Sequence, residues 1–211
     1  MKSMYSPPKV LKMMFPKSIW NSKSDKILLT FDDGPNPETT DMILEELEKQ
    51  NIKALFFCVG ENAVDNPKLI ESIANEGHTI GNHTHSHQNI MLKSKSVIDR
   101  QIKVCSNALF DITGERTKYF RPPHGKFDHR TNYFMKSHQL TNVMWSLLTY
   151  DYKNDLNIVK FAVQNYLTKN SIIVLHDSIK SKNIIRSSIE TIAEIASTKS
   201  YEFGEPSECL K

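Results

Sequence analysis

The sequence predicts an α/β protein whose strands are parallel and covered by helices. Short apolar runs alternate about seven times with amphipathic segments along the 211 residues. Such uninterrupted apolar runs are typical of parallel strands that are buried on both faces. The length fits one domain with a sizeable core. We therefore expect a barrel of β/α units, with a doubly wound open sheet as the alternative. The sequence contains no GxGxxG or GxxxxGK[ST] loop to indicate a nucleotide site.

Each expected strand is an apolar run that stops at a turn-forming or polar residue. The first run stops at the turn that begins with Asp32, the third stops before Gly81, and the fourth stops at Arg121. The last run is a candidate edge strand. In chain order, the expected strands are residues 27–31, 54–60, 79–80, 119–120, 141–145, 172–175 and 201–203.

Each expected helix has apolar residues at helical spacing and polar residues on its other face. In the first helix, Ile43 and Leu47 lie on the apolar side. Pro67 breaks the second helix and Gly77 ends it. In chain order, the expected helices are residues 39–49, 61–75, 96–110, 132–137, 156–167 and 184–196.

The composition excludes several classes of protein. Hydrophobic residues make up 39% and charged residues 24% of the chain, which excludes an intrinsically disordered protein. The net charge of +3 is too small to indicate nucleic-acid binding, so no nucleic-acid partner is expected. The 3 cysteines are widely spaced and form no CxxC pair, so neither a disulfide framework nor a cysteine zinc site is expected.

The first 26 residues differ from the rest in charge. They carry 6 lysines and 1 acid, so we expect residues 1–26 to form a solvated basic arm before a domain at 27–211. Contact with an anionic surface is the alternative. The chain shows neither a long apolar span nor the apolar centre of a signal peptide, so no stable membrane insertion and a cytoplasmic location are expected. A monomer is the default expectation.

Chemically reactive side chains follow the carboxyl ends of the expected strands. In β/α barrels the active site is built at this rim, because the loops of different strands meet there. This shared position is stronger evidence than any single motif. The candidates, in chain order, are Asp32, Asp33, the cluster from His83 to His87, Arg121, Asp151 and His176.

Two histidines and one carboxylate are candidate metal ligands. His83 and His87 are four residues apart, so on one helical turn both imidazoles would point the same way. His85 lies between them and should point elsewhere. Either Asp32 or Asp33 can supply the carboxylate while the other faces the substrate. Such a ligand set suits hydrolysis through metal-activated water, and also the non-haem iron oxygenases. Two exposed histidines and a simple turn are the plain alternative.

Three further residues complete the candidate chemistry. His176 is a candidate general acid, and a nearby Asp151 would raise its pKa so that it stays protonated. Arg121 can hold a catalytic carboxylate through a charge-assisted contact. The alternatives are a histidine that only bonds a loop and a structural Arg–Asp pair.

Taken in order, these motifs resemble those of the NodB-type polysaccharide deacetylases, carbohydrate esterase family 4. The resemblance runs from about residue 27 to 203 and rests on TFDDGP at 30–35, HTHSH at 83–87, RPPHG at 121–125, WS at 145–146, DY at 151–152 and LH at 175–176. It implies a single-domain, distorted (β/α)7 barrel.

The resemblance also implies a role for each residue. Asp33, His83 and His87 would bind one divalent metal ion, with Zn²⁺ expected first and Co²⁺, Ni²⁺ or Fe²⁺ as alternatives. The remaining implied roles are Asp32 as catalytic base, Arg121 as the residue that orients it, His176 as catalytic acid, Asp151 as its partner, the backbone N–H of His124 as an oxyanion donor, Leu175 as lining for the acetyl methyl group, and Trp145 and Tyr152 as substrate contacts.

The implied activity is removal of N-acetyl groups from a peptidoglycan- or chitin-type glycan, with release of acetate. An O-acetyl esterase acting on a xylan-like polysaccharide and a catalytically silent carbohydrate-binding protein are alternatives. Family members usually act on cell-surface glycans, so action at the cell envelope is a second expectation for the location. Three residues depart from common family forms, namely His124 for tyrosine, Tyr152 for tryptophan and Leu148 for aspartate.

Overall fold

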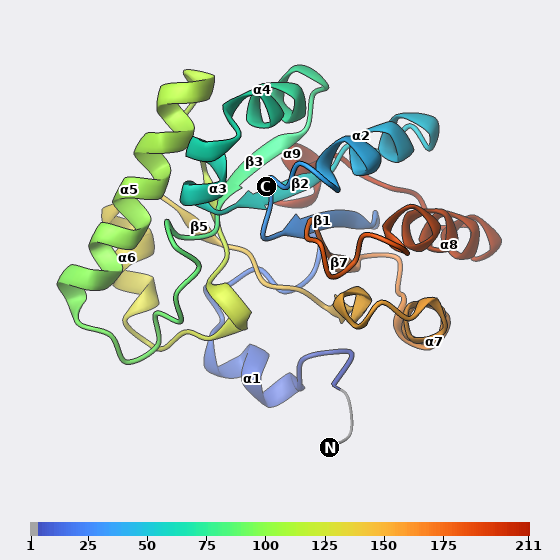
Figure 1. Ribbon diagram of the computed structural model, residues 1–211. Coiled ribbons are helices and arrows are strands. Elements are labelled where there is room, and N and C mark those ends of the chain that lie inside the picture. Colours follow the sequence, from blue (N-terminus) through green and yellow to red (C-terminus); the bar gives the residue numbers. More distant parts are fainter. Residues whose placement is uncertain (1–3) are drawn as a thin grey trace.

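Within residues 4–211, which the computed structural model describes, seven parallel strands form one curled sheet (Figure 1). The spatial order of the strands is β5-β4-β3-β2-β1-β7-β6. Neighbouring strands are also neighbours in the chain, apart from β1 and β7, as in a barrel that does not close. The strands are β1 (Leu28–Asp32), β2 (Leu55–Cys58), β3 (Thr79–Asn82), β4 (Tyr119–Phe120), β5 (Thr141–Asn142), β6 (Leu147–Leu148) and β7 (Ile172–His176).

Helices cover the outer side of this sheet. Local signals explain several of their ends: Pro67 starts α4, the Ser94 hydroxyl caps α5 by accepting from Val97 N, and Gly114 ends α5 with a φ of 71°. The helices are α1 (Lys9–Met14), α2 (Thr40–Lys49), α3 (Gly60–Asp65), α4 (Pro67–Asn75), α5 (Lys95–Thr113), α6 (Thr131–Ser137), α7 (Leu156–Tyr166), α8 (Ile185–Thr198) and α9 (Pro206–Cys209), with short 3₁₀ turns η1 (Pro123–Gly125) and η2 (Asp151–Lys153).

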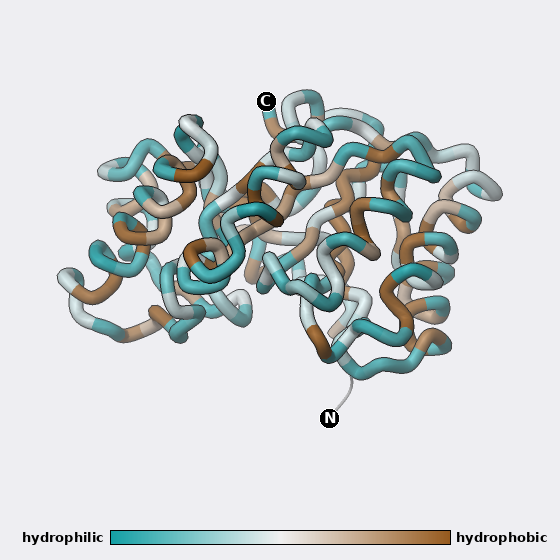
Figure 2. Tube along the Cα trace, turned by 45° about the horizontal axis from the view of Figure 1, so that its top comes forward, coloured by the Kyte–Doolittle hydropathy of each residue, from teal (hydrophilic) through white to brown (hydrophobic). Residues whose placement is uncertain are grey.

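Two layers of core lie on opposite faces of the sheet. Alternate residues of a strand point to opposite faces. Leu29 and Phe31 of β1 therefore pack into the large cluster beneath the helices, whereas Leu28 packs with Ile172 into a smaller cluster inside the curl. Figure 2 shows hydrophobic residues alternating with hydrophilic ones along the outer helices, as expected for helices with one buried face.

The curled sheet is open between β5 and β6, which the chain joins directly without a helix. The N-terminal segment packs at this opening. Ile19 N donates to Asn142 O, and Met144 N donates to Ile19 O, at 2.9 and 2.8 Å. Further along the same side, Leu148 N donates to Tyr5 O at 2.8 Å.

The expectation of a solvated N-terminal arm is therefore wrong for the segment around Trp20, whose side chain is only 7% exposed. Its residues complete backbone pairing that the open edge lacks. The lysines of this segment still lie mainly at the surface, and α1 buries none of its residues. The domain boundary at residue 26 stays a prediction.

Most expected elements are confirmed, but the short helices α1 and α9 were not expected, and three strands differ. The strand expected at 141–145 is shorter and ends at Asn142. The two-residue strand β6 was not expected from the sequence. The strand expected at 201–203 is a single bridge between Ile27 and Phe203. The break at Pro67 is confirmed.

The register of the strands brings their carboxyl ends to one rim. Asp32 of β1 is the register partner of His176 of β7. On the other side of β1, Cys58 of β2 pairs with Asn82 of β3, which pairs in turn with Phe120 of β4. Loops that leave these strands therefore start side by side. No helix within residues 4–211 is both long enough and apolar enough to cross a membrane.

Candidate active site

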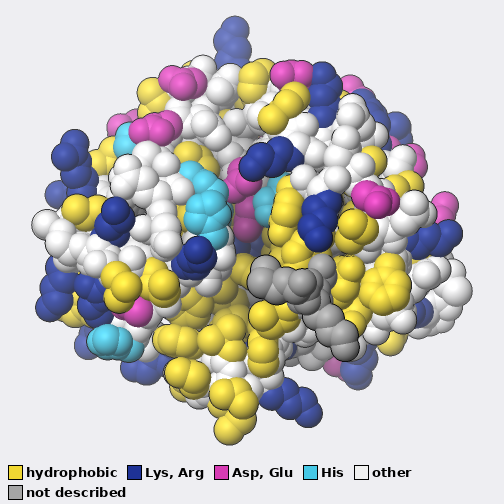
Figure 3. Space-filling model, turned by 60° about the horizontal axis from the view of Figure 1, so that its bottom comes forward, with side chains coloured by type: hydrophobic (Ala, Val, Ile, Leu, Met, Phe, Trp, Pro, Cys, Tyr) yellow, Lys and Arg dark blue, Asp and Glu magenta, His cyan; other side chains and the backbone are white. Residues whose placement is uncertain are grey.

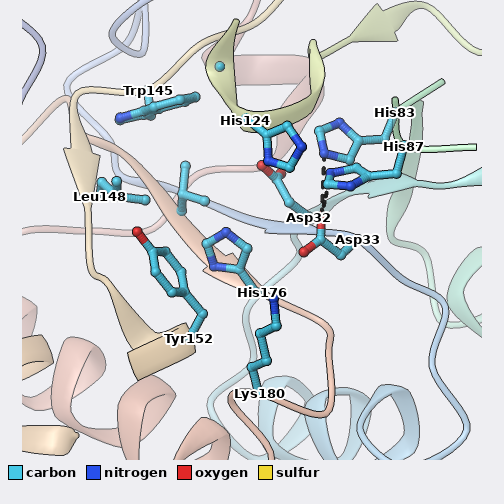
Figure 4. Close-up of a pocket in the computed structure, with 12 residues that line it drawn as sticks. Asp32, Asp33, His83, His87, His124, Trp145, Leu148, Tyr152, His176 and Lys180 are labelled. Atoms are coloured by element: carbon cyan, nitrogen blue, oxygen red, sulfur yellow. Dashed lines mark ion pairs between the residues drawn. The ribbon is translucent and has the colours of Figure 1, made fainter. Parts of the chain in front are cut away.

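A cavity of about 320 Å³ opens at this rim (Figures 3 and 4). It brings together residues from six loops or strand ends. The lining residues are Asp32, Asp33, His83, His87, His124, Gly125, Trp145, Leu148, Tyr152, Val174, His176 and Lys180. Of the residues expected to face the substrate or bind a metal, all but Leu175 line this cavity.

Asp32, the last residue of β1, is held by Arg121. Arg121 Nη1 donates to Asp32 Oδ1 at 2.7 Å and to Thr30 Oγ1 at 2.7 Å. The other guanidinium nitrogens donate to the backbone oxygens of Val143 and Met144 at 2.9 and 2.8 Å. Because these bonds fix a fully buried guanidinium, the Asp32 carboxylate has one orientation toward the cavity. This geometry agrees with the implied roles, which stay predictions.

Asp33 turns away from Asp32 and meets the two histidines. Its φ of 79° lies in the left-handed region, so the two adjacent side chains diverge. Asp33 Oδ1 lies 3.5 Å from His83 Nε2 and 3.0 Å from His87 Nε2 (Figure 4). Burial opposes ionisation of Asp33, but the hydrogen bonds with His83 and His87 hold the pKa of this carboxyl well below its ordinary value.

The three candidate ligand atoms fit a single divalent ion. They lie within 4.8 Å of one another. Ligand atoms around a tetrahedral ion with bonds of about 2.0–2.1 Å are about 3.3 Å apart, close to the two distances from Asp33. His83 Nδ1 donates to Arg121 O at 2.7 Å, so Nε2 is the nitrogen that faces Asp33 and would bind a metal.

The histidines converge from a loop rather than from a helix. The expectation of one helical turn is wrong, because Thr84 and His87 have φ values of 68° and 51°. Side chains of β3 and α5 hold this loop: Asn82 Oδ1 accepts from Thr84 N at 2.8 Å, and Gln101 Oε1 accepts from His85 N and Ser86 N at 3.1 and 2.9 Å.

His85 points away from the cavity, as expected from its place between the two ligands. It lines a groove beside α5 together with Gln101 and Val104. It is therefore no part of the candidate metal site.

His176 forms a close pair with Asp151. His176 Nδ1 lies 2.7 Å from Asp151 Oδ1, and His176 N donates to Asp151 Oδ2 at 2.7 Å. Burial lowers the pKa of the imidazole, but the fully buried Asp151 carboxylate outweighs it, and the pKa of His176 rises to about 9. His176 is therefore protonated at neutral pH, and its Nε2 is left for the cavity. The Tyr152 ring and the imidazole form a T-shaped pair, with centroids 4.9 Å apart.

The turn after Arg121 forms the opposite wall. His124 has a φ of 57°, and Gly125 follows with a φ of 64°. A Cβ atom on Gly125 would collide with the Trp145 ring, so only glycine fits both the backbone and the packing there. The His124 ring lies beside that of His87, with centroids 4.6 Å apart.

The expectation that Leu175 lines the cavity is wrong. Its side chain is fully buried in the core beneath the helices. Because side chains alternate along β7, the residues that face inward are Val174 and His176, and Val174 lines the cavity together with Leu148. The sequence signal for Val174 is its place two residues before His176, since residues two apart in a strand point to the same face.

Asp177 is a supporting residue that sequence reasoning missed. Its buried carboxylate accepts hydrogen bonds from the hydroxyls of Thr39 and Thr40 at 2.5 and 2.6 Å. Asp177 N donates to Asp32 O at 2.8 Å, and the carboxylate packs directly against Gly34. Asp177 thus joins the end of β7 to the turn that carries both candidate aspartates. The sequence signal was an acid directly after a candidate catalytic histidine.

The family model for polysaccharide deacetylases matches residues 21–143. The chain is similar to a peptidoglycan-N-acetylglucosamine deacetylase of Bacillus cereus, with 40% identity over 61% of this chain and 46% of the relative. It is 32% identical to the peptidoglycan-N-acetylglucosamine deacetylase PgdA of Listeria monocytogenes, over 94% of this chain and 41% of that one. The chain thus spans less than half the length of these two relatives.

A solved structure has the same fold. The Bc1960 peptidoglycan N-acetylglucosamine deacetylase, in complex with a benzamide, superposes with a TM-score of 0.87 at 30% identity, over 92% of each chain.

We expect Gly34→Ala to weaken both the fold and the metal site. The new methyl group would displace the Asp177 carboxylate, which two threonines hold in place, and overpacking of this kind costs about 1–3 kcal/mol of unfolding free energy. Zinc affinity, measured by competition with a chromophoric chelator, should fall as well.

Gly114→Ala is the matched control, because Gly114 has a φ of +71° but open space around its Cα. It should lower stability through backbone strain and leave zinc affinity as it is. Unchanged stability and zinc affinity in Gly34→Ala would contradict the role given to Asp177.

Proposed function

This chain belongs to the polysaccharide deacetylase family, and from that premise we propose that it hydrolyses N-acetyl groups on amino-sugar units of a peptidoglycan- or chitin-type glycan and releases acetate. One observation carries the proposal. His176, kept protonated by Asp151, faces the same cavity as the Arg121-held carboxylate of Asp32 and the Asp33–His83–His87 ligand set. An acid, a base and a metal site in one cavity suit the metal-assisted hydrolysis of an amide.

Asp33, His83 and His87 would hold the metal ion. Three protein ligands of nitrogen and carboxylate type, facing an open cavity, suit Zn²⁺ best, and Co²⁺, Ni²⁺ and Fe²⁺ accept the same donors. When bound, such an ion would polarise the acetyl carbonyl and lower the pKa of water.

Asp32 would act as the base that takes a proton from the attacking water. Arg121 donates to Asp32 Oδ1 and so holds the carboxylate in one orientation toward the cavity. The N–H of His124 would donate to the oxygen that becomes negative, a contact typically worth about 10²–10³ in rate.

His176 would then protonate the departing nitrogen from Nε2. Asp151 holds Nδ1, so the transferable proton is the one that faces the cavity. The apolar side chains of Val174 and Leu148 form the wall that suits the acetyl methyl group, and Trp145 and Tyr152 offer aromatic surface to the sugar ring.

We propose that a single chain suffices, since all these residues come from one chain. A peptidoglycan substrate would place its action at the cell envelope, in contrast to the cytoplasmic location expected from the sequence.

Acetate release from three polymers tests the proposal. Peptidoglycan and chitin oligomers should yield acetate and free amines in the presence of zinc, whereas acetylated xylan should yield little. Preferential release from xylan would favour the O-acetyl esterase, and no release from any of them, with metal bound, would favour the silent binding protein.

Asparagine variants should separate the two adjacent aspartates. Asp32→Asn leaves the metal ligands in place, so it should bind zinc normally and lose kcat by about 10²–10⁴-fold. Asp33→Asn replaces a charged ligand by a neutral one, so it should bind zinc weakly, and excess zinc should restore part of its activity. Elemental analysis and rescue kinetics measure both effects. Rescue of Asp32→Asn but not of Asp33→Asn would reverse the two roles.

We expect Asp151→Asn to lower the upper pH limit of activity. Asp151 raises the pKa of His176 to about 9, so loss of its charge lets the imidazole deprotonate at lower pH. The alkaline limb of the kcat/KM profile should therefore move to lower pH. Asp155→Asn is the control, because Asp155 caps α7 and lies outside the cavity. An alkaline limb that stays in place in Asp151→Asn would mean that Asp151 is structural or that His176 is not the acid.

A further inference from the structure

Lys180 is a cavity residue that none of the proposed chemical steps uses. It follows β7 by four residues and lines the cavity. Figure 4 shows its side chain extending from below toward His176. Lys180 is exposed, and within residues 4–211 it forms no salt bridge and no side-chain hydrogen bond. Among the described residues, this cation at the mouth of the cavity therefore has no acidic partner.

The acids of the cavity already have partners, so Lys180 is not needed to neutralise any of them. Asp32 is paired with Arg121, and Asp33 faces the two histidines and the proposed metal. The acid behind the cavity, Asp151, is paired with His176. The ammonium of Lys180 is therefore surplus positive charge directed at the space that a substrate would occupy.

The loop that carries Lys180 is fixed on both sides of it. Ser181 Oγ donates to His176 O at 2.5 Å and to Ser178 O at 2.9 Å. Lys182 pairs with Glu38 in the loop before α2. The Lys180 Cα thus has a set position next to the candidate acid, and only its side chain moves.

Two more lysines extend the positive charge along the rim. Lys126 follows the lining residue Gly125, and Lys153 follows the lining residue Tyr152. Both are exposed, and neither has an acidic partner in the described part of the chain. Figure 3 shows basic side chains around the hollow, with acidic side chains inside it. An anionic substrate would therefore be attracted to the whole rim.

We propose that Lys180 makes the cavity selective for amino-sugar glycans that carry a carboxylate close to the acetamido group. This inference rests on the proposed deacetylase function and names its substrate class. An ammonium on a flexible stem pairs with a carboxylate without demanding one geometry, which suits a substituent on a sugar ring. Because Lys180 lies next to the residue that would protonate the sugar nitrogen, the carboxylate it reaches belongs to the bound unit or its neighbour.

A matched pair of substrates tests the inference. One is a peptidoglycan disaccharide with its lactyl carboxylate free, and the other is the same disaccharide with this carboxylate converted to the methylamide. The zinc-loaded wild type should prefer the free acid, with about a 10-fold or larger ratio in kcat/KM that arises mainly from KM. Added salt should reduce the ratio.

Lys180→Met keeps an unbranched side chain of nearly the same length and removes the charge, so the acid-to-amide ratio should fall about 10-fold. Lys160→Met is the matched control, because Lys160 is an exposed lysine of α7 outside the cavity, and it should retain the wild-type ratio. Equal ratios in the wild type and Lys180→Met would overturn the inference, and so would an equal fall in Lys160→Met.

A binding measurement separates this inference from the proposed function. Calorimetric titration of each disaccharide into the zinc-loaded protein measures the acid-to-amide ratio of binding affinities, independently of acetate release. Absence of acetate release with a ratio that depends on Lys180 would reject the deacetylase and keep the carboxylate site. Acetate release with no preference for the acid in rate or in binding would reject the carboxylate site alone. Failure of both disaccharides to bind would reject it as well.

Discussion

The buried guanidinium of Arg121 is the group around which the site is organised. A charge with no exposed surface costs several kcal/mol unless it is paired and hydrogen-bonded on all sides. Here Asp32 supplies the counter-charge, and Thr30 with the carbonyls of Val143 and Met144 supplies the other acceptors. Loss of any one partner leaves a buried donor unsatisfied, so the end of β1 and the segment between β5 and β6 have to remain together.

The opening of the barrel is what makes these carbonyls accessible. In a closed barrel, the segment between β5 and β6 would use its backbone groups to pair with neighbouring strands. Here Ile19 satisfies some of them, and Arg121 takes the carbonyls that remain directed inward. The carbonyl of Arg121 in turn accepts from His83. The open edge therefore connects the candidate base to the candidate metal ligand, and the N-terminal segment is part of that arrangement.

The sequence predicted the residues of the site better than it predicted their local geometry. Buried strands appear in the sequence as apolar runs, and the polar residues that follow them are equally visible. The positions of Asp32, Asp33 and His176 at one rim therefore followed from the sequence alone. The conformation of the loop between His83 and His87 depends on positive φ values and on side chains of another helix, which no periodicity reports. The family resemblance placed Leu175 at the cavity wall. Because side chains alternate along β7, Val174 lines that wall instead.

The two adjacent carboxylates of the site each have their own partner. Asp32 has Arg121, and Asp33 has the ligand histidines and the proposed metal. In the proposed reaction, Asp32 gains a proton and His176 loses one. Arg121 and Asp151 would then each be a buried charge with a neutral partner, which is unfavourable. The surroundings therefore favour return of both groups to the ionised state after each turnover, and the same pairs that orient the base and the acid also restore them.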